Sequence, residues 1–270
     1  VLVVGMGNSA MDIASELSQR PIAQKLFVSA RRGVWIFPKY YKGQPLDKNP
    51  APAWMPKWLR QKIGEKLIKN LVGRMRDYGL PEPEIGPFES HGTVSGEFLL
   101  RAGSGDICMK PGIDRLDGQY VVFTDGSREE VGAIIWATGY DIKFPFFEDP
   151  GLIADADNRP PPLYKRIIKP GVPDLFYMGL AQPVPTLVNF AEQQSKLVGA
   201  YLAGDYLPPA VDEMQRIIAA DEDYYTGQYY AARRHTIQLD FDHYCRALKK
   251  ELAKGAKRAA AKGNPVPVLG

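Results

Sequence analysis

The first 33 residues alternate between short apolar runs and one helical pattern. Val1–Val4 is an unbroken apolar run typical of a buried strand, and Gly5-Met6-Gly7 turns the chain after it. A helix that ends near Pro21 follows, and its apolar face is formed by Ile13, Ala14 and Leu17. A second apolar run at 25–29 completes an order of strand, helix and strand, which predicts a βαβ unit in a parallel sheet.

Residues 34–90 break this alternation. The segment is rich in proline, and its aromatic residues include Trp35, Tyr40, Tyr41, Trp54 and Trp58. A helix is predicted at about 57–75 from apolar residues spaced four apart, at Leu59, Ile63, Leu67 and Leu71. We expect an insertion packed over the sheet, with its aromatic side chains in a core rather than forming a platform for a ligand.

Short strands return in the middle of the chain. Asp125-Gly126 is a typical hairpin turn, and it lies among three apolar runs that predict strands, at 107–109, 119–124 and 133–136. The loop-rich stretch 145–162 marks a crossover to a further domain. Beyond it the pattern predicts a strand at 175–179, a helix at 192–202 and a long helical segment at about 212–262.

The composition is that of a globular protein. Of the 270 residues, 45% are hydrophobic and 24% are charged, which is enough chain for one large domain or two ordinary ones. The net charge, 34 − 31 = +3, is too small to indicate nucleic acid or a membrane as a partner. No apolar run approaches the ~20 residues needed to span a bilayer, and no signal peptide is recognisable.

The few cysteines and histidines exclude two further classes of site. Cys108 and Cys245 form no CxxC pair, and the histidines are scattered, at His91, His235 and His243. A disulfide framework and a metal site are therefore not expected, and reduced thiols with a cytoplasmic location are. Because Val1 already lies inside an apolar run, we also expect the chain to be a fragment of a longer protein.

The strongest local signal is Gly5-Met6-Gly7-Asn8-Ser9-Ala10, between the first predicted strand and helix. In a dinucleotide-binding loop the first glycine allows the tight turn, the second lets the backbone approach the pyrophosphate, and a small third residue allows close helix packing. Ala10 is that third residue, and the helix N-terminus favours phosphate. The alternative is the nucleophile elbow of an α/β-hydrolase, but Met11 replaces its final glycine.

The end of the second strand indicates which dinucleotide is bound. NAD-selective folds place Asp or Glu there, about 20 residues after the glycines, whereas this chain has Ser29-Ala30-Arg31-Arg32. Guanidinium groups hold a 2′-phosphate through charge-assisted hydrogen bonds, and a carboxylate would repel it. We therefore expect NADP(H), bound through Ser29 and Arg31, with Arg32 helping or stacking on the adenine. Two solvated surface arginines are the alternative.

Several segments together resemble the flavin-containing monooxygenases, a group of class B flavoprotein monooxygenases. Residues 1–14 are similar to the NADPH-site motif of that family, and Ala137-Thr138-Gly139-Tyr140 is similar to its ATGY signature. The remaining similar segments are 179–183 and 192–194, which resemble the return to the FAD domain, and 234–240 with Tyr244, which resemble the C-terminal region. Their order and spacing agree with the family along the whole chain.

The resemblance implies an α/β fold with three parts. Residues 1–145 would be a Rossmann-like NADPH-binding domain that carries the helical insertion at 34–90. Residues 146–207 would be the second half of an FAD-binding Rossmann-like domain, and 208–270 a helical C-terminal segment. Family members also carry an earlier FAD-binding GxGxxG and an FxGxxxH motif, which these 270 residues lack. The N-terminal FAD half is therefore expected to be missing, and the chain alone to be inactive.

The resemblance also implies the chemistry of the complete protein. NADPH would reduce FAD, and the reduced flavin would capture O₂ as a C4a-hydroperoxide that oxygenates an amine nitrogen, a sulfide or a ketone. The implied partners are a small-molecule substrate and O₂, and a homo-oligomer is left open. Two alternatives are a non-enzymatic NADP(H)-binding remnant and another flavoprotein with two dinucleotide sites, such as a disulfide reductase.

All expected site residues bind cofactors, and none is assigned to catalysis or metal. The pyrophosphate would be lined by Gly5, Gly7, Asn8, Ser9 and Ala10, and the 2′-phosphate by Ser29, Arg31 and Arg32. The resemblance places three residues at the junction between domains, Thr138, Gly139 and Tyr140, and three on the flavin side, Gln182, Glu192 and Gln194. For the junction residues the alternative is a simple connecting turn, and for Gln182 it is a surface amide.

Overall fold

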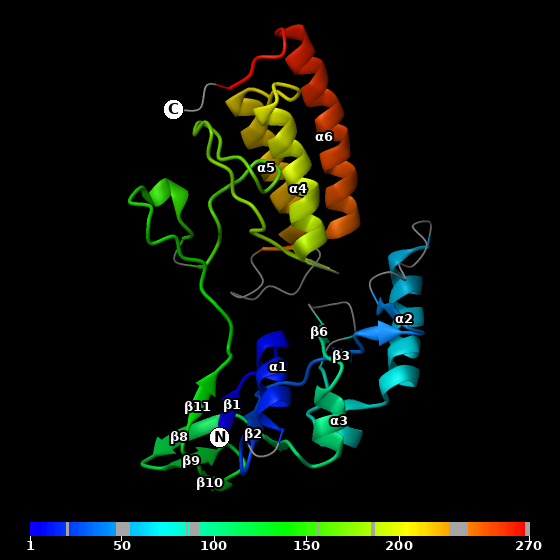
Figure 1. Cartoon of the computed structure of the whole chain (residues 1–270), viewed down its shortest axis with the longest axis vertical. Coiled ribbons are helices and arrows are strands. Elements are labelled where there is room, and N and C mark those ends of the chain that lie inside the picture. Colours follow the sequence, from blue (N-terminus) through cyan, green and yellow to red (C-terminus); the bar gives the residue numbers. More distant parts are fainter. Residues whose placement is uncertain are drawn as a thin grey trace. The chain divides into compact units, whose positions relative to one another are not determined.

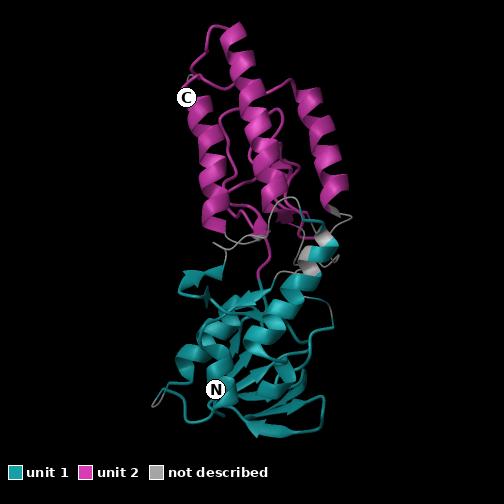
Figure 2. Cartoon of the chain, turned by 90° about the vertical axis from the view of Figure 1, so that its right-hand side faces the viewer, with its two compact units in different colours: residues 1–139 teal, residues 140–270 magenta. Residues whose placement is uncertain are grey.

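The structure of the protein is a computed structural model. It describes residues 1–19, 22–46, 55–84, 86, 92–155, 157–184, 187–226 and 237–267. The chain divides into two compact units, Val1–Gly139 and Tyr140–Gly270 (Figure 2). None of the helices in the described ranges combines the length and the apolar character that crossing a membrane requires.

The first unit alternates strands and helices. In chain order it contains β1 (Leu2–Val4), α1 (Asn8–Leu17), β2 (Phe27–Ser29), β3 (Ile36–Phe37), β4 (Tyr40–Tyr41), β5 (Gln44–Pro45), α2 (Lys57–Val72), a 3-10 turn (Met75–Tyr78), β6 (Thr93–Val94), α3 (Phe98–Gly103), β7 (Cys108–Lys110), β8 (Ile113–Asp117), β9 (Tyr120–Phe123), β10 (Arg128–Glu130) and β11 (Ile134–Trp136).

Four parallel strands form the central sheet of this unit, in the order β11-β1-β2-β7 (Figure 1). The predicted βαβ unit is confirmed, because α1 joins β1 to its parallel neighbour β2. The helix buries Ala10, Met11 and Ala14 in one core with Val3 and Val28 of the sheet. The order of strands reverses at β1, which is the arrangement of a Rossmann-like fold.

An antiparallel meander, β10-β9-β8, packs on the other face of the sheet. Val121 and Phe123 of β9 share a core with Leu2 and Phe27, which alternate along β1 and β2 with the residues that face α1. The predicted hairpin is confirmed, and its turn is the expected Asp125-Gly126. Its second strand is the charged segment β10, which no apolar run indicated.

The insertion contains its predicted helix, α2, but with a different buried face. Ile68 and Val72 are buried, whereas Ile63 and Leu71 are 48% and 39% exposed. In a helix with 3.6 residues per turn, a row of residues four apart drifts by about 40° at each step. The apolar row seen in the sequence therefore wraps around the helix instead of following one face of it.

The aromatic residues of the insertion divide between core and surface. Trp35 is buried as expected, and Lys69 lies over its ring, 5.6 Å from the centroid. Tyr40 and Trp58 are 60% and 61% exposed, so the expectation of an aromatic core is wrong for these two. Trp54 lies outside the described residues.

The second unit is built mainly from helices. Its elements are a 3-10 turn (Pro150–Leu152), β12 (Gln182–Val184), α4 (Leu187–Leu202), α5 (Val211–Thr226), β13 (Gln238–Asp240) and α6 (Phe241–Ala261). The three helices lie side by side (Figures 1 and 2) around one core. That core includes Phe190 and Leu197 of α4, Ile218 of α5 and Leu248 of α6. Strands β12 and β13 pair in parallel.

Two sequence-based predictions for this unit are wrong. The strand expected at 175–179 does not form, because Phe176 makes only an isolated bridge to Ile168. The long helical segment is two helices, α5 and α6, separated in the chain by strand β13. Residues 227–236, which include Arg234 and His235, lie outside the described part of the chain. The helix predicted at 192–202 is confirmed as part of α4.

Helix α6 packs closely on Tyr206. The Tyr206 hydroxyl donates a hydrogen bond of 3.1 Å to Glu251, which also pairs with Arg258. Burial, followed by the charge of Glu251, raises the pKa of Tyr206 above its usual range. Gly255 lies against the ring, and a Cβ added to it would come within 2.0 Å of a ring carbon. The absence of a side chain at Gly255 thus allows α6 to approach this buried group.

Two glycine-to-alanine changes in helices should have opposite effects on stability. Gly255→Ala is expected to lower the free energy of unfolding by roughly 1–3 kcal/mol, because the added methyl overpacks the core against Tyr206. Gly199→Ala in α4 meets no atom within 4 Å. It should raise the free energy of unfolding by up to about 1 kcal/mol, through helix propensity alone. Urea unfolding followed by circular dichroism measures both, and equal effects would contradict the packing described.

Candidate functional site

The ends of β1 and β11 meet at the carboxyl edge of the central sheet. The Ala137 N–H donates to the Val4 carbonyl at 2.8 Å, and the Gly5 N–H donates to the Ser29 carbonyl at 3.0 Å. Gly5 has a φ of +131°, and a Cβ there would lie 2.3 Å from the carbonyl oxygen of Ala137. The close approach of the Ala137 backbone therefore requires a glycine at position 5. These contacts bring the turns after β1, β2 and β11 together.

Within the described residues, no steric contact requires a glycine at position 7. Gly7 is exposed, it is the N-cap residue of α1 with a φ of −89°, and a Cβ there would meet no atom within 4 Å. Among the described residues no side chain caps the N-terminus of α1, so its backbone N–H groups can bind an anion. A dinucleotide that passes close to the backbone would fill the space that a Cβ would occupy.

The next three residues of the loop have different surroundings. Asn8 and Ser9 are exposed, and Asn8 Oδ1 accepts a hydrogen bond of 2.9 Å from the Val94 N–H. Ala10 is 1% exposed, and a Cβ added to Gly5 would lie 3.6 Å from its Cβ. Ala10 therefore serves the close packing of helix on strand that its small size predicted.

Near the end of β2, Ser29 and the two arginines differ in exposure. Ser29 is 2% exposed, and its hydroxyl donates to the Pro111 carbonyl at 2.6 Å. Arg31 and Arg32 are exposed. The Cγ of Arg31 lies beside Gly112, 3.1 Å from where a Cβ would be. Of the three residues expected at a 2′-phosphate, the two arginines are thus exposed, whereas the serine hydroxyl is used internally.

Thr138, Gly139 and Tyr140 follow Ala137, the residue after β11, and all three are exposed. Gly139 has a φ of +109°, a conformation in which other residues are strained. Thr138 and Gly139 end the first unit, and Tyr140, 85% exposed, begins the second. Ala137, just before them, lies against Gly5 of the glycine loop.

The three residues expected on the flavin side lie in the second unit. Gln182 begins β12. Glu192 is exposed on α4 and pairs with Lys196 at 3.3 Å. Gln194 is fully buried: its Oε1 accepts from the Gly179 N–H at 2.8 Å, and its Nε2 donates to the Arg166 carbonyl at 3.1 Å. Its amide supports the core of this unit.

Sequence reasoning missed the segment Thr93–Ser95, which lies against the glycine loop. Thr93 is 3% exposed, and its hydroxyl donates to the Met6 carbonyl at 3.2 Å. The Val94 N–H binds Asn8, as described above. The segment is too short to show a periodic pattern, so nothing in its composition indicated this contact.

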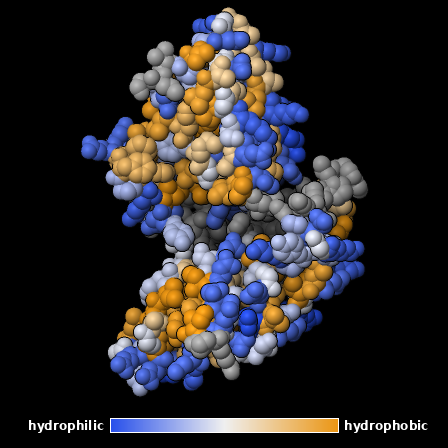
Figure 3. Space-filling view, viewed as in Figure 1, coloured by the Kyte–Doolittle hydropathy of each residue, from blue (hydrophilic) through white to orange (hydrophobic). Residues whose placement is uncertain are grey.

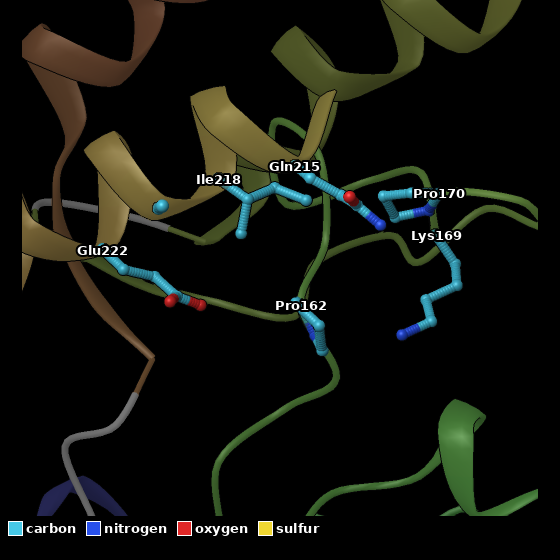
Figure 4. A pocket seen from close by; sticks show the side chains of 7 residues that line it. Pro162, Lys169, Pro170, Gln215, Ile218 and Glu222 are labelled. Atoms are coloured by element: carbon cyan, nitrogen blue, oxygen red, sulfur yellow. The ribbon is translucent and has the colours of Figure 1, made fainter. Parts of the chain in front are cut away.

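A separate pocket of about 260 Å³ lies in the second unit, between the chain at 162–170 and helix α5 (Figure 4). Its lining is Pro162, Lys169, Pro170, Gln215, Ile218, Ala219 and Glu222. None of the residues expected to bind a cofactor lines it.

Apolar residues also reach the surface of the molecule (Figure 3), and the most exposed include Phe146 and Val188.

Two curated proteins are similar to this chain over most of its length. Flavin-containing monooxygenase 5 of Oryctolagus cuniculus is 30% identical over 252 residues, which cover 89% of this chain and 46% of that protein. Dimethylaniline monooxygenase (N-oxide-forming) 2 of Rattus norvegicus is 31% identical over 272 residues, which cover 95% and 49%. The chain therefore spans about half the length of these curated relatives.

A solved structure gives the same fold. The crystal structure of cyclohexanone monooxygenase from Rhodococcus sp. Phi1 bound to NADP⁺ superposes with a TM-score of 0.56 at 12% identity. The match covers 95% of this chain and 65% of that one, and it concerns the fold alone. The model of flavin-binding monooxygenase-like proteins matches residues 1–259, from the start of the first unit into the last turn of α6. The chain thus belongs to the flavin-binding monooxygenase-like family.

Proposed function

We propose that this chain is the nucleotide-binding and C-terminal part of an NADPH- and FAD-dependent monooxygenase. Family membership supports the reaction class. The observation that carries the nucleotide site is Gly7, a glycine with an ordinary φ and open space around it. No contact among the described residues needs a glycine there, so the close approach of a ligand to the backbone would explain why position 7 is glycine.

The residues of the first unit fit an NADP(H) dinucleotide. The N–H groups at the N-terminus of α1 would hold the pyrophosphate, together with Asn8 and Ser9. Arg31 and Arg32 would bind the 2′-phosphate through charge-assisted hydrogen bonds. Ser29 would act indirectly in this proposal, since its carbonyl fixes Gly5 and its hydroxyl holds the turn at Pro111.

When bound, NADPH supplies a hydride, and FAD uses it to activate O₂ for transfer of one oxygen atom to the substrate. The role of this chain would be to bind and orient the nucleotide, with Thr138, Gly139 and Tyr140 as further candidate cofactor-binding residues. For the second unit we propose Gln182 and Glu192 as residues on the flavin side. Gln194 would support that side through Gly179, whose N–H it binds.

The substrate class of the complete protein is also a proposal. The rat relative is named for N-oxide formation, and the structural relative is named for a ketone. We propose a small molecule with a soft nucleophilic nitrogen or sulfur, or a ketone, with O₂ as the second substrate. The cytoplasmic location expected from the sequence is part of the same proposal.

Changing each glycine of the loop separately tests the nucleotide site. Gly7→Ala should lower the melting temperature only slightly, because glycine is somewhat preferred to alanine at an N-cap and the methyl meets no atom of the described residues within 4 Å. It should weaken NADP⁺ binding about tenfold or more. Isothermal titration calorimetry on the full chain measures the affinity. Gly5→Ala is the contrasting variant, since its Cβ would collide with Ala137, and it should unfold the first unit. Unchanged binding by Gly7→Ala would show that no ligand approaches the loop there.

The preference for NADPH over NADH should depend on Arg31. Arg31→Ala is expected to weaken NADP⁺ binding by about 10- to 100-fold, which is the loss of one charged hydrogen-bonding group, and to leave NAD⁺ binding nearly unchanged. Arg115→Ala is the matched control, because Arg115 is an exposed arginine of β8 that pairs with Asp114. Equal losses for the two nucleotides, or for the two variants, would contradict the assignment.

A further inference from the structure

The segment Thr93–Ser95, here called the strap, is held on one side by strand β3. The N–H groups of Thr93 and Ser95 donate to the carbonyls of Trp35 and Phe37, each at 3.0 Å. Val94 lies between them, and its N–H takes no part in this ladder. The Val94 N–H points away from β3 and donates to Asn8 Oδ1 at 2.9 Å. The Ser95 hydroxyl also accepts the Phe98 N–H at 3.1 Å, which ties the strap to the start of α3.

The strap donates hydrogen bonds to two acceptors of the glycine loop, which are then no longer open to other donors. Thr93 donates its hydroxyl to the Met6 carbonyl, and Val94 donates its N–H to Asn8 Oδ1. Both acceptors carry partial negative charge, which would repel a phosphate placed against the loop. With both satisfied by the strap, the loop keeps its donors, the N–H groups at the start of α1, for an anion.

The same contact fixes the orientation of the Asn8 amide. A backbone N–H can donate only to an acceptor, so the oxygen of the amide must face Val94. The NH₂ group of Asn8 is then directed away from the strap, at the exposed N-terminus of α1. The Asn8 side chain therefore offers a hydrogen-bond donor to a ligand, and the ligand atom that binds it must be an acceptor such as a phosphate oxygen.

We infer that the strap positions Asn8 as a hydrogen-bond donor to the pyrophosphate of the bound dinucleotide. Val94 is the positioning residue, and it acts through its main-chain N–H rather than its side chain. The inference rests on the proposed nucleotide site, and it adds a segment 86 residues away in the chain to that site.

Val94→Pro tests this role, because proline lacks the N–H that Val94 donates. The two N–H groups that pair the strap with β3 belong to Thr93 and Ser95, so the ladder is kept. Val94→Ala is the matched control, since it shortens the side chain and retains the N–H. We expect Val94→Pro to weaken NADP⁺ binding about five- to tenfold and Val94→Ala to leave it unchanged.

Adenosine 2′-monophosphate separates positioning from a structural role, because it carries the 2′-phosphate but no pyrophosphate. Its affinity, measured by the same calorimetry, should be equal in the wild type and both Val94 variants. Equal loss of NADP⁺ binding in Val94→Pro and Val94→Ala, or loss of adenosine 2′-monophosphate binding as well, would overturn the inference. If the wild-type chain binds neither ligand, the proposed nucleotide site fails, and the inference with it.

Asn8→Asp is a second variant that does not depend on the strap tolerating proline. Aspartate keeps an oxygen for the Val94 N–H and replaces the NH₂ donor by a second carboxylate oxygen. A negative charge at a helix N-terminus favours folding, so a loss of binding would not come from unfolding. We expect NADP⁺ affinity to fall about tenfold or more, with adenosine 2′-monophosphate affected less. Unchanged NADP⁺ affinity would show that the Asn8 amide is no donor to the ligand.

Discussion

The contact between Gly5 and the backbone of Ala137 is the constraint on which the nucleotide site depends. Strands β1 and β11 are parallel neighbours that end at the same edge of the sheet, and their turns leave in the same direction. A Cβ at Gly5 would come within 2.3 Å of the Ala137 carbonyl oxygen. With glycine there, the chain enters α1 directly, and the helix N-terminus lies where the order of strands reverses, the usual place of ligands in open α/β sheets.

A second constraint comes from the strap, which follows the insertion in the chain. Thr93 and Val94 donate hydrogen bonds to two acceptors of the glycine loop, the Met6 carbonyl and Asn8 Oδ1. Buried polar groups need such partners, and here a donor is matched to each acceptor. The sign of the partial charges that remain at the loop is therefore decided by a segment far away in the chain.

In the second unit, buried side chains hold an unfavourable backbone in place. Lys165 and Arg166 have backbone φ values of 49° and 57°, which residues other than glycine rarely adopt. The Tyr244 hydroxyl donates to the Lys165 carbonyl at 2.7 Å, and Gln194 donates to that of Arg166. Such conformations persist where the surroundings over-determine them. This accounts for the complete burial of Gln194, whose amide the resemblance had placed beside the flavin.

The sequence by itself determined the features that local spacing encodes. The glycines of the loop, the apolar runs around it and the Asp125-Gly126 turn are short-range patterns, and the βαβ unit and the hairpin form where they predict. The family followed from the order of such motifs along the chain. These features are readable because turn geometry and helical or strand periodicity depend on neighbouring residues.

Only the tertiary structure decided which partner each group takes. The helix α2 has apolar residues on several sides, and packing selected Ile68 and Val72 for burial. The run at 175–179 has the composition of a strand, yet it makes a single bridge, because a strand requires a neighbour to accept its hydrogen bonds. The hydroxyl of Ser29 and the amide of Asn8 are likewise committed to Pro111 and Val94, contacts between distant segments that no local pattern records.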